Sequence, residues 1–185
     1  TTPNSDPTTR YISAWAEKTI AELKTKHLQF IVLARERAVL PVLESMLKRH
    51  APSLLFLNGH GGPNLVCGHN NEVLIMVGQN EVILRETITY ALSCGSARKL
   101  GPATIKAGAA AYIGYDEDFI FFRSQEKIGR PTEDKTAAMF LAPANHVVVS
   151  LAKGHTTREA VDAAKGYFFR GIQKLLSSET PPDER

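Results

Sequence analysis

Short apolar runs alternate with longer segments of helical periodicity along most of the chain, and this alternation limits the folds open to it. Strands alternating with helices predict an α/β protein, a three-layer α/β/α sandwich around a mostly parallel sheet. We predict strands at 30–34, 54–57, 73–77, 87–92 and 110–115, with 119–122 as a further edge. We predict helices at 11–26, 37–49, 97–107, 133–152 and 156–176, with a helical turn at 81–84. No apolar strand precedes the first helix, so either the domain begins at that helix or its first strand lies upstream of this sequence.

Length and composition are typical of a single folded domain. The 185 residues are 43% hydrophobic and 22% charged, which is ordinary for a globular protein. The net charge is +3 with acids and bases intermixed, which gives little support to nucleic-acid or membrane binding through a basic patch. The apolar runs are too short to span a bilayer, and no signal sequence opens the chain. Two cysteines provide no disulfide framework, so we expect a reducing, cytoplasmic setting.

Reactive residues follow two of the predicted strands, near the point where each strand ends. His60 follows the strand at 54–57 and Cys94 follows the strand at 87–92. The run 58–63, rich in glycine, is predicted to be a loop. In an open parallel sheet, functional residues gather at the carboxyl ends of the strands. If these two strands are parallel neighbours, the imidazole and the thiol lie at the same edge of the sheet.

The residues around His60 and Cys94 suit nucleophilic catalysis. Gly61 and Gly62 allow positive φ and let a ligand approach the backbone closely. The amides of Gly61 and Cys94 could donate hydrogen bonds to a developing oxyanion. We predict a helix beginning near Ala97, and its N-terminus would favour the reactive thiolate of Cys94. His60 would act as general base or ion-pair partner and then protonate the leaving amine.

Three sequence segments carry a resemblance to a known family. A strand ending in N-G-H-G, a strand ending in Y-A-L-S-C-G-S, and a helix followed by A-G-A-A-A-Y-I-G-Y resemble the caspase-like cysteine peptidases, most closely the CHAT and gingipain members. The segment D-P-T-T-R-Y at 6–11 is similar to the segment after the first strand in such proteins. The resemblance covers residues 6–122 and leaves the helices at 133–177 unmatched, within one domain spanning 1–185.

The resemblance implies an activity and its residues. His60 and Cys94 become the catalytic dyad of an endopeptidase, with Gly61 as an oxyanion donor beside the Cys94 amide. The substrate would be a protein or peptide, no cofactor is required, and regulatory domains or partner proteins are a further expectation. The caspase signature Q-A-C-x-G is absent, since Leu92 and Ser93 precede the cysteine. Caspase specificity therefore does not transfer to this chain.

Asp116, Glu117 and Asp118 follow the predicted strand at 110–115 and form an acidic cluster. In the family that the chain resembles, the segment after this strand helps to wall the pocket for the substrate residue before the scissile bond. An acidic wall would favour Lys or Arg in the substrate. A solvated acidic turn is the alternative interpretation.

Other functions remain open on the same residues. A non-catalytic interaction or signalling module of the same fold would carry the dyad in vestigial or misaligned form. His60, Cys67, His69 and Cys94 are all potential zinc ligands, although their spacing matches no common zinc motif. We otherwise expect Cys67 to be structural. No G-x-S-x-G elbow supports a serine hydrolase, and the glycine-rich loop lacks the phosphate-loop pattern.

Overall fold

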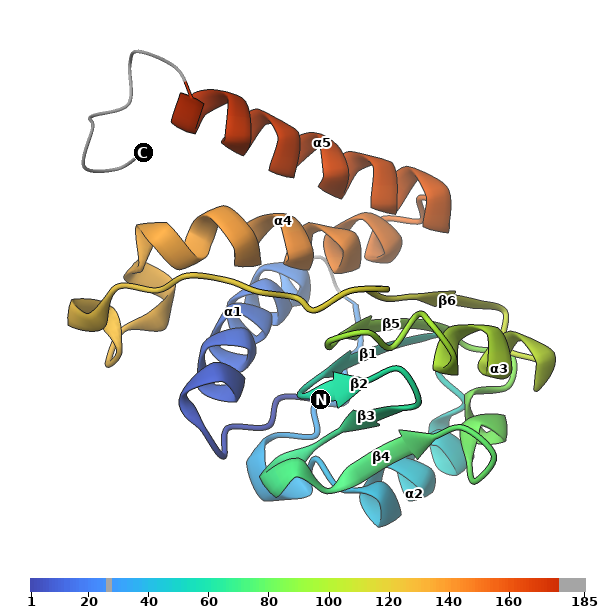
Figure 1. Cartoon of the computed structure of the whole chain (residues 1–185). Helices are drawn as coiled ribbons and strands as arrows, with labels where there is room; N and C mark the ends of the chain where they lie inside the picture. Colours follow the sequence, from blue (N-terminus) through green and yellow to red (C-terminus); the bar gives the residue numbers. More distant parts are fainter. Residues whose placement is uncertain (26–27, 177–185) are drawn as a thin grey trace. The chain divides into compact units, whose positions relative to one another are not determined.

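The computed structural model describes residues 1–25 and 28–176, which divide into two compact units, Thr1–Ile120 and the residues from Phe121 onward. The helices of the first unit are α1 (Pro7–Lys24), η1 (Arg35–Arg37), α2 (Leu40–His50), η2 (His69–Asn71), η3 (Glu81–Leu84) and α3 (Leu100–Lys106). Its strands are β1 (Leu54–Asn58), β2 (Gly61–Gly62), β3 (Leu65–Cys67), β4 (Val73–Met76), β5 (Ile88–Leu92) and β6 (Ala111–Ile113). The second unit contains η4 (Gln125–Lys127), η5 (Pro131–Glu133), α4 (Lys135–Ala152) and α5 (Thr157–Leu176) (Figure 1).

A parallel sheet of order β1-β5-β6 runs through the first unit (Figure 1). Along β1 and β5 the register pairs Leu54 with Ile88 at one end and Asn58 with Leu92 at the other. The two strands are therefore parallel neighbours that end level with each other. This confirms the α/β class and the predicted arrangement of the two strands that precede His60 and Cys94.

A small antiparallel sheet, β2-β3-β4, occupies the connection between β1 and β5. The prediction that 58–63 is wholly loop is wrong, because Gly61 and Gly62 pair with Val66 and Leu65 as one arm of a hairpin. The turn between these arms is two residues long, and a tight turn of this kind forces its flanking residues to pair. A connection between parallel strands more often contains a helix.

Other elements differ from the prediction in extent. The run 30–34 forms no strand; its contribution to a sheet is one bridge, between Ala34 and Thr2. Residues 119–122 form no strand either. The helix expected from Ala97 begins only at Leu100, because the amide of Leu100 and that of the residue before it both donate to the carbonyl of Pro63. The preceding residues follow this loop contact instead of a helical path.

The core of the first unit lies between the sheets and α2. Its members are buried aliphatic side chains from both sheets and from the helices and loops that contact them: Leu33, Leu43, Leu57, Val66, Leu74, Ile75, Leu84, Ala91 and Leu100. The parallel strands contribute Leu57 and Ala91, which are register partners and therefore lie on the same face of the sheet. Four consecutive residues of β5, Thr89–Leu92, are buried, so both faces of that strand are covered. The core thus ends at the last residues of β1 and β5, directly below the two loops that carry His60 and Cys94.

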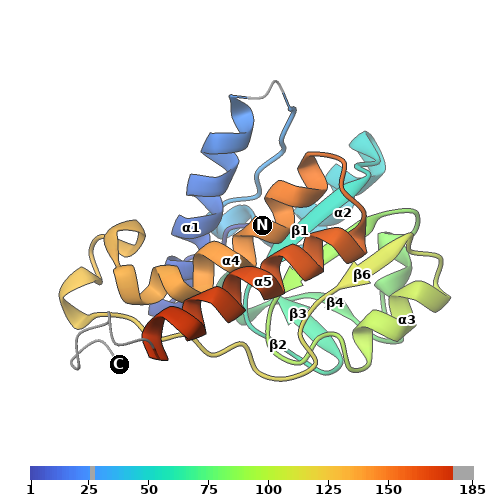
Figure 2. The same cartoon turned by 90° about the horizontal axis from the view of Figure 1, so that it is seen from above.

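In the second unit, α4 and α5 lie side by side (Figures 1 and 2). The Asp134 side chain caps α4 by accepting from Ala137 N. The predicted capping box of α5 is confirmed: Thr156 and Glu159 exchange side-chain to backbone hydrogen bonds. Among the described residues, the model contains no helix with the length and apolar character needed to cross a membrane.

Candidate active site

The loops after β1 and β5 meet at the carboxyl edge of the parallel sheet. His60 and Cys94 each lie two residues beyond the last paired position, Asn58 with Leu92. The backbone of Gly61 lies directly against Ser93, since a Cβ on Gly61 would fall 2.7 Å from the Ser93 Oγ. Two loops that are far apart in sequence are thus held in contact at the residues next to the imidazole and the thiol.

The imidazole of His60 has a carboxylate partner. Its Nε2 lies 3.1 Å from Oδ2 of Asp6, and the two side chains are 41% and 30% exposed. A hydrogen bond from Nε2–H to the carboxylate would fix the tautomer and the orientation of the ring. The other ring nitrogen, Nδ1, would then be the one able to accept a proton.

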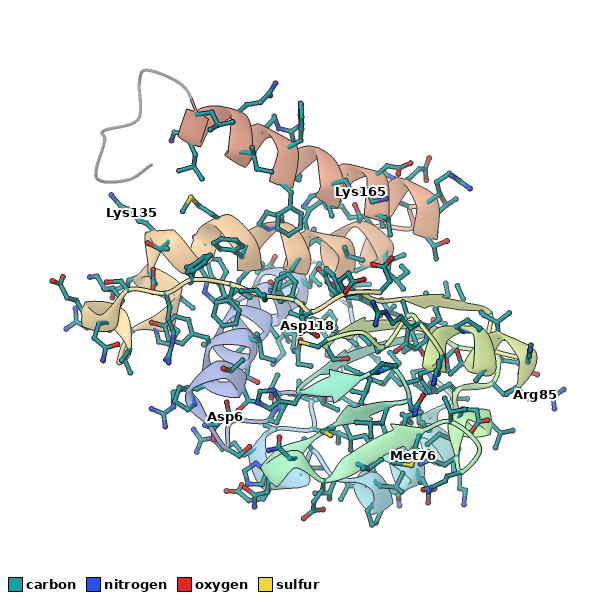
Figure 3. The ribbon with its side chains drawn as sticks, viewed as in Figure 1. Asp6, Met76, Arg85, Asp118, Lys135 and Lys165 are labelled. Carbon is teal, nitrogen blue, oxygen red and sulfur yellow. The ribbon has the colours of Figure 1, made fainter. Side chains whose placement is uncertain are left out.

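Asp6 is itself held firmly, because it is the N-cap of α1. Its Oδ1 accepts from the amides of Thr8 and Thr9, and its Oδ2 accepts from the Thr9 hydroxyl. Pro7 occupies the first helical position, where its fixed φ suits the helix and no amide donor is needed. The start of α1 therefore fixes the position of the carboxylate that contacts His60 (Figure 3).

The net effect of these contacts is to keep Asp6 ionised. Partial burial, the largest single influence, would raise the pKa of Asp6. The hydrogen bonds from Thr9 and the charge and hydrogen bond of His60 outweigh it, so the pKa of Asp6 lies below its usual value. The ring of His60 therefore has a negatively charged hydrogen-bond partner.

The thiol of Cys94 has a different carboxylate partner. Burial is the main cause that raises the pKa of Cys94, and the charge of Asp118 and its hydrogen bond with the thiol raise it further. The backbone N–H groups of Phe119 and of Cys94 itself act in the opposite direction but do not offset this rise. The thiol form therefore dominates at neutral pH, in contrast to the activated thiolate that the sequence suggested.

The prediction that a helix N-terminus stabilises the thiolate of Cys94 is wrong. Helix α3 begins six residues later, at Leu100, and spans only Leu100–Lys106. Between Cys94 and α3 the chain forms turns. The helix dipole acts mainly within the first turn of a helix, so Cys94 gains no such stabilisation.

The hairpin that follows His60 orients the amide of Gly61. Cys67 N donates to the carbonyl of His60 at 2.8 Å, which makes Gly61 and Val66 a facing pair without mutual hydrogen bonds. The N–H of Gly61 consequently points away from β3. An amide in this orientation, beside Ser93 and the Cys94 loop, is suitable as a donor to a ligand at the sheet edge.

The three residues of the acidic cluster 116–118 make different contacts. Asp118 reaches the Cys94 thiol, as described above. Glu117 forms an exposed ion pair with Arg98, Oε1 to Nη2 at 2.5 Å. Its carbonyl accepts from the amide of Gly95 at 3.0 Å. Asp116 is exposed. The segment after β6 thus contacts the cysteine loop with two of its three acidic residues.

The remaining potential metal ligands lie apart from this arrangement. Cys67 is buried in β3, 8% exposed, and burial raises its pKa, as expected for a structural cysteine. His69 lies in η2, where its amide donates to the carbonyl of Ala38. Within residues 1–25 and 28–176, no three His, Cys, Asp or Glu side chains are grouped so that they could hold a metal ion.

Sequence reasoning assigned no role to Asp6. The signal was present in the run D-P-T-T, in which an aspartate precedes proline and the helical periodicity, a typical N-cap pattern. That pattern predicts where α1 begins, but it does not predict which loop the capping carboxylate faces. The contact with His60, 54 residues away, depends on where α1 lies relative to β1.

These contacts describe a site in which the loops that carry the two reactive side chains touch, while a different carboxylate acts on each side chain. His60 is held by Asp6, and Cys94 is held by Asp118. No family model, no curated protein and no solved structure matches the chain.

Proposed function

We propose that the protein is a cysteine endopeptidase with a caspase-like arrangement of its α/β layers. The observation that supports this most strongly is the parallel register of β1 and β5, which ends the two strands level and directs His60 and Cys94 to the same edge. The contact between Gly61 and Ser93 adds that the two loops touch next to these residues. Both cysteines are free thiols, which suits the reducing, cytoplasmic setting we propose.

In the proposed reaction, Cys94 attacks the carbonyl carbon of a peptide bond while His60 takes the thiol proton at Nδ1. A C–S bond forms, and the carbonyl oxygen becomes an oxyanion that accepts hydrogen bonds from the amides of Gly61 and Cys94. His60 then gives its proton to the departing amine as the C–N bond breaks. Water hydrolyses the thioester, which releases the acid and restores the thiol. Asp6 holds the His60 ring in position throughout.

We further propose that the substrate carries Lys or Arg before the scissile bond. Asp118 lies next to the nucleophile, and its negative charge would attract a cationic side chain to that position. Glu117 is less available, because Arg98 already pairs with it. A library of fluorogenic peptides that differ only at this residue tests the preference. Faster cleavage after Asp than after Lys or Arg would contradict it.

The second candidate function is a non-catalytic interaction module of the same architecture. It is favoured by one observation, which is that the thiol of Cys94 and the imidazole of His60 are bound to different carboxylates. A module of this kind would retain both side chains for structural reasons. It would cleave no peptide under any condition in which the fold is intact.

Substitution of the nucleophile decides between the two candidates. We expect Cys94→Ala to abolish the cleavage of the peptide library while circular dichroism remains that of the wild type. Cys67→Ala is the matched control, because Cys67 is buried in β3 and has no part in the proposed reaction. We expect it to keep its activity. Cleavage by Cys94→Ala at the wild-type rate would refute the proposal.

A further inference from the structure

The segment 115–119, which we call the strap, lies along the turn that carries Cys94. The amide of Gly95 donates to the carbonyl of Glu117 at 3.0 Å, and the amide of Ala97 donates to the carbonyl of Tyr115 at 2.9 Å. Two backbone hydrogen bonds in the same direction align the strap with the turn. They place Asp118 opposite the residue that precedes Gly95.

Side-chain contacts fix Tyr115 to the sheet and join it to Phe119 at the other end of the strap. The hydroxyl of Tyr115 lies 3.2 Å from that of Tyr90, a fully buried residue of β5. The Tyr115 ring packs on the Phe119 ring with 4.7 Å between centroids. Between these anchors, Glu117 pairs with Arg98 on the surface. An exposed pair of this kind contributes little free energy, so the tyrosines and the backbone bonds hold the strap in place.

Burial is the main cause of the raised pKa of Cys94; within the strap, Asp118 raises this pKa further and the amide of Phe119 lowers it. The two backbone hydrogen bonds pair residue 95 with 117 and 97 with 115, so the next pair in this register sets Asp118 opposite Cys94, where its negative charge acts on the thiol. Of the other carboxylates near the two loops, Asp6 pairs with His60, Glu117 pairs with Arg98, and Asp116 is exposed. Asp118 is therefore the carboxylate that the register of the strap places opposite Cys94. Its charge opposes formation of the thiolate.

We propose that the strap is a built-in attenuator, in which Asp118 keeps Cys94 as a protonated thiol until the carboxylate is neutralised or withdrawn. Loss of the thiol proton would leave a thiolate and a carboxylate side by side, and their repulsion opposes that step. A cationic group that pairs with Asp118 would remove the repulsion and release the sulfur. The consequence for peptide cleavage rests on the proposed function, but the effect on the thiol does not.

The test is the rate at which iodoacetamide alkylates Cys94 at pH 7, followed by mass spectrometry of the full chain. Asp118→Asn removes the charge with almost no change of shape. Each unit by which the thiol pKa falls raises the thiolate fraction about tenfold, but the weaker nucleophile reduces the gain to about threefold. We therefore expect alkylation of Cys94 to be about threefold faster, or more, in Asp118→Asn. Asp118→Glu keeps the charge and should retain the slow wild-type rate.

Cys67 serves as the internal control, because it lies in β3 away from the strap. Its alkylation should be equally slow in the wild type and in both variants. A Cys94 rate in Asp118→Asn that does not exceed the wild-type rate would overturn the proposal. An equal increase in the alkylation rates of Cys67 and Cys94 would also overturn the proposal, because it would show that the substitution had destabilised the fold as a whole.

The peptide library, applied to the same variants, separates this proposal from the proposed function. Faster alkylation of Asp118→Asn without cleavage by any variant would keep the attenuator and refute the peptidase. Cleavage by the wild type, with the same alkylation rate in all variants, would support the peptidase and refute the attenuator. We expect both effects together: faster alkylation of Asp118→Asn and faster cleavage of a peptide without a cationic residue.

Discussion

Substitution of Asp6 tests whether one carboxylate supports both a helix and the candidate site. We expect Asp6→Ala to lower the free energy of unfolding of the first unit by about 1 to 2 kcal/mol. Loss of an N-cap side chain costs about 1 kcal/mol, and α1 would lose the acceptor for the amides of Thr8 and Thr9. The exposed ion pair with His60 adds less than about 1 kcal/mol, because solvent screens it.

Asp6→Asn is the matched variant. Asparagine caps a helix as well as aspartate does, so this variant should lose only the charge interaction with His60. We expect its free energy of unfolding to lie within about 1 kcal/mol of the wild-type value. The difference between the two variants at neutral pH then measures the cap alone.

The pH dependence of the effect follows from the direction of the pKa shift. The pKa of Asp6 is lowered in the folded state, so its contribution is fully present above the unfolded value, near 3.8, and is lost as the pH falls through the folded value. The stability advantage of the wild type over Asp6→Ala should therefore be retained from neutral pH to about pH 5. It should shrink in stronger acid.

Urea unfolding followed by tryptophan fluorescence is the appropriate assay. Trp15 is the single tryptophan of the chain and is buried, 6% exposed, on the same helix that Asp6 caps. The signal therefore reports the first unit. If Asp6→Ala unfolds within about 0.5 kcal/mol of the wild type, as surface substitutions usually do, Asp6 does not hold the start of α1. Equal losses in Asp6→Ala and Asp6→Asn would refute the separation of cap and charge.

Three further outcomes can be measured. Gly61→Ala should destabilise the first unit by about 1–3 kcal/mol, because its Cβ would lie 2.7 Å from the Ser93 Oγ. Gly62→Ala, whose Cβ would meet nothing within 4 Å, should unfold near the wild-type urea midpoint. An equal loss of stability in Gly61→Ala and Gly62→Ala would contradict the argument. Asp134→Ala should cost about 2 kcal/mol in thermal unfolding followed by circular dichroism, because buried Asp134 accepts from two backbone amides; an unchanged melting curve would contradict this. Cleavage by the wild type should increase from pH 7 towards pH 9, because the raised pKa keeps Cys94 protonated at neutrality; a pH–rate profile that falls over this range would refute a thiolate nucleophile.

The hydrophobic periodicity and the reactive residues that follow two strands were enough to predict the strands on which the site is built. The alternation of apolar runs predicted the α/β class, and the runs before His60 and Cys94 are β1 and β5, paired in parallel. These predictions succeeded because buried parallel strands are short and continuously apolar, a pattern that depends on the local sequence. The capping box at Thr156 and the turn at 81–84 succeeded for the same reason.

The partners of the two reactive side chains could not be predicted. Asp6 and His60 are brought together by the packing of α1, and Asp118 reaches Cys94 because the strap bonds to the turn before α3. Such contacts depend on tertiary placement, which periodicity does not encode. The late start of α3 has the same origin, since Pro63 from another loop takes the amide of Leu100.

The connection between β1 and β5 has a consequence for engineering. The gap between the two loops is set by the hydrogen-bonded ladder of β1 and β5, and the chain that joins them folds as a separate sheet. The length of the turn that follows the last strand of that sheet does not enter the spacing of His60 and Cys94. A peptide tag inserted in the turn after β4, next to Gly78 at a φ of +77° and the exposed Gln79, should leave this spacing unaltered.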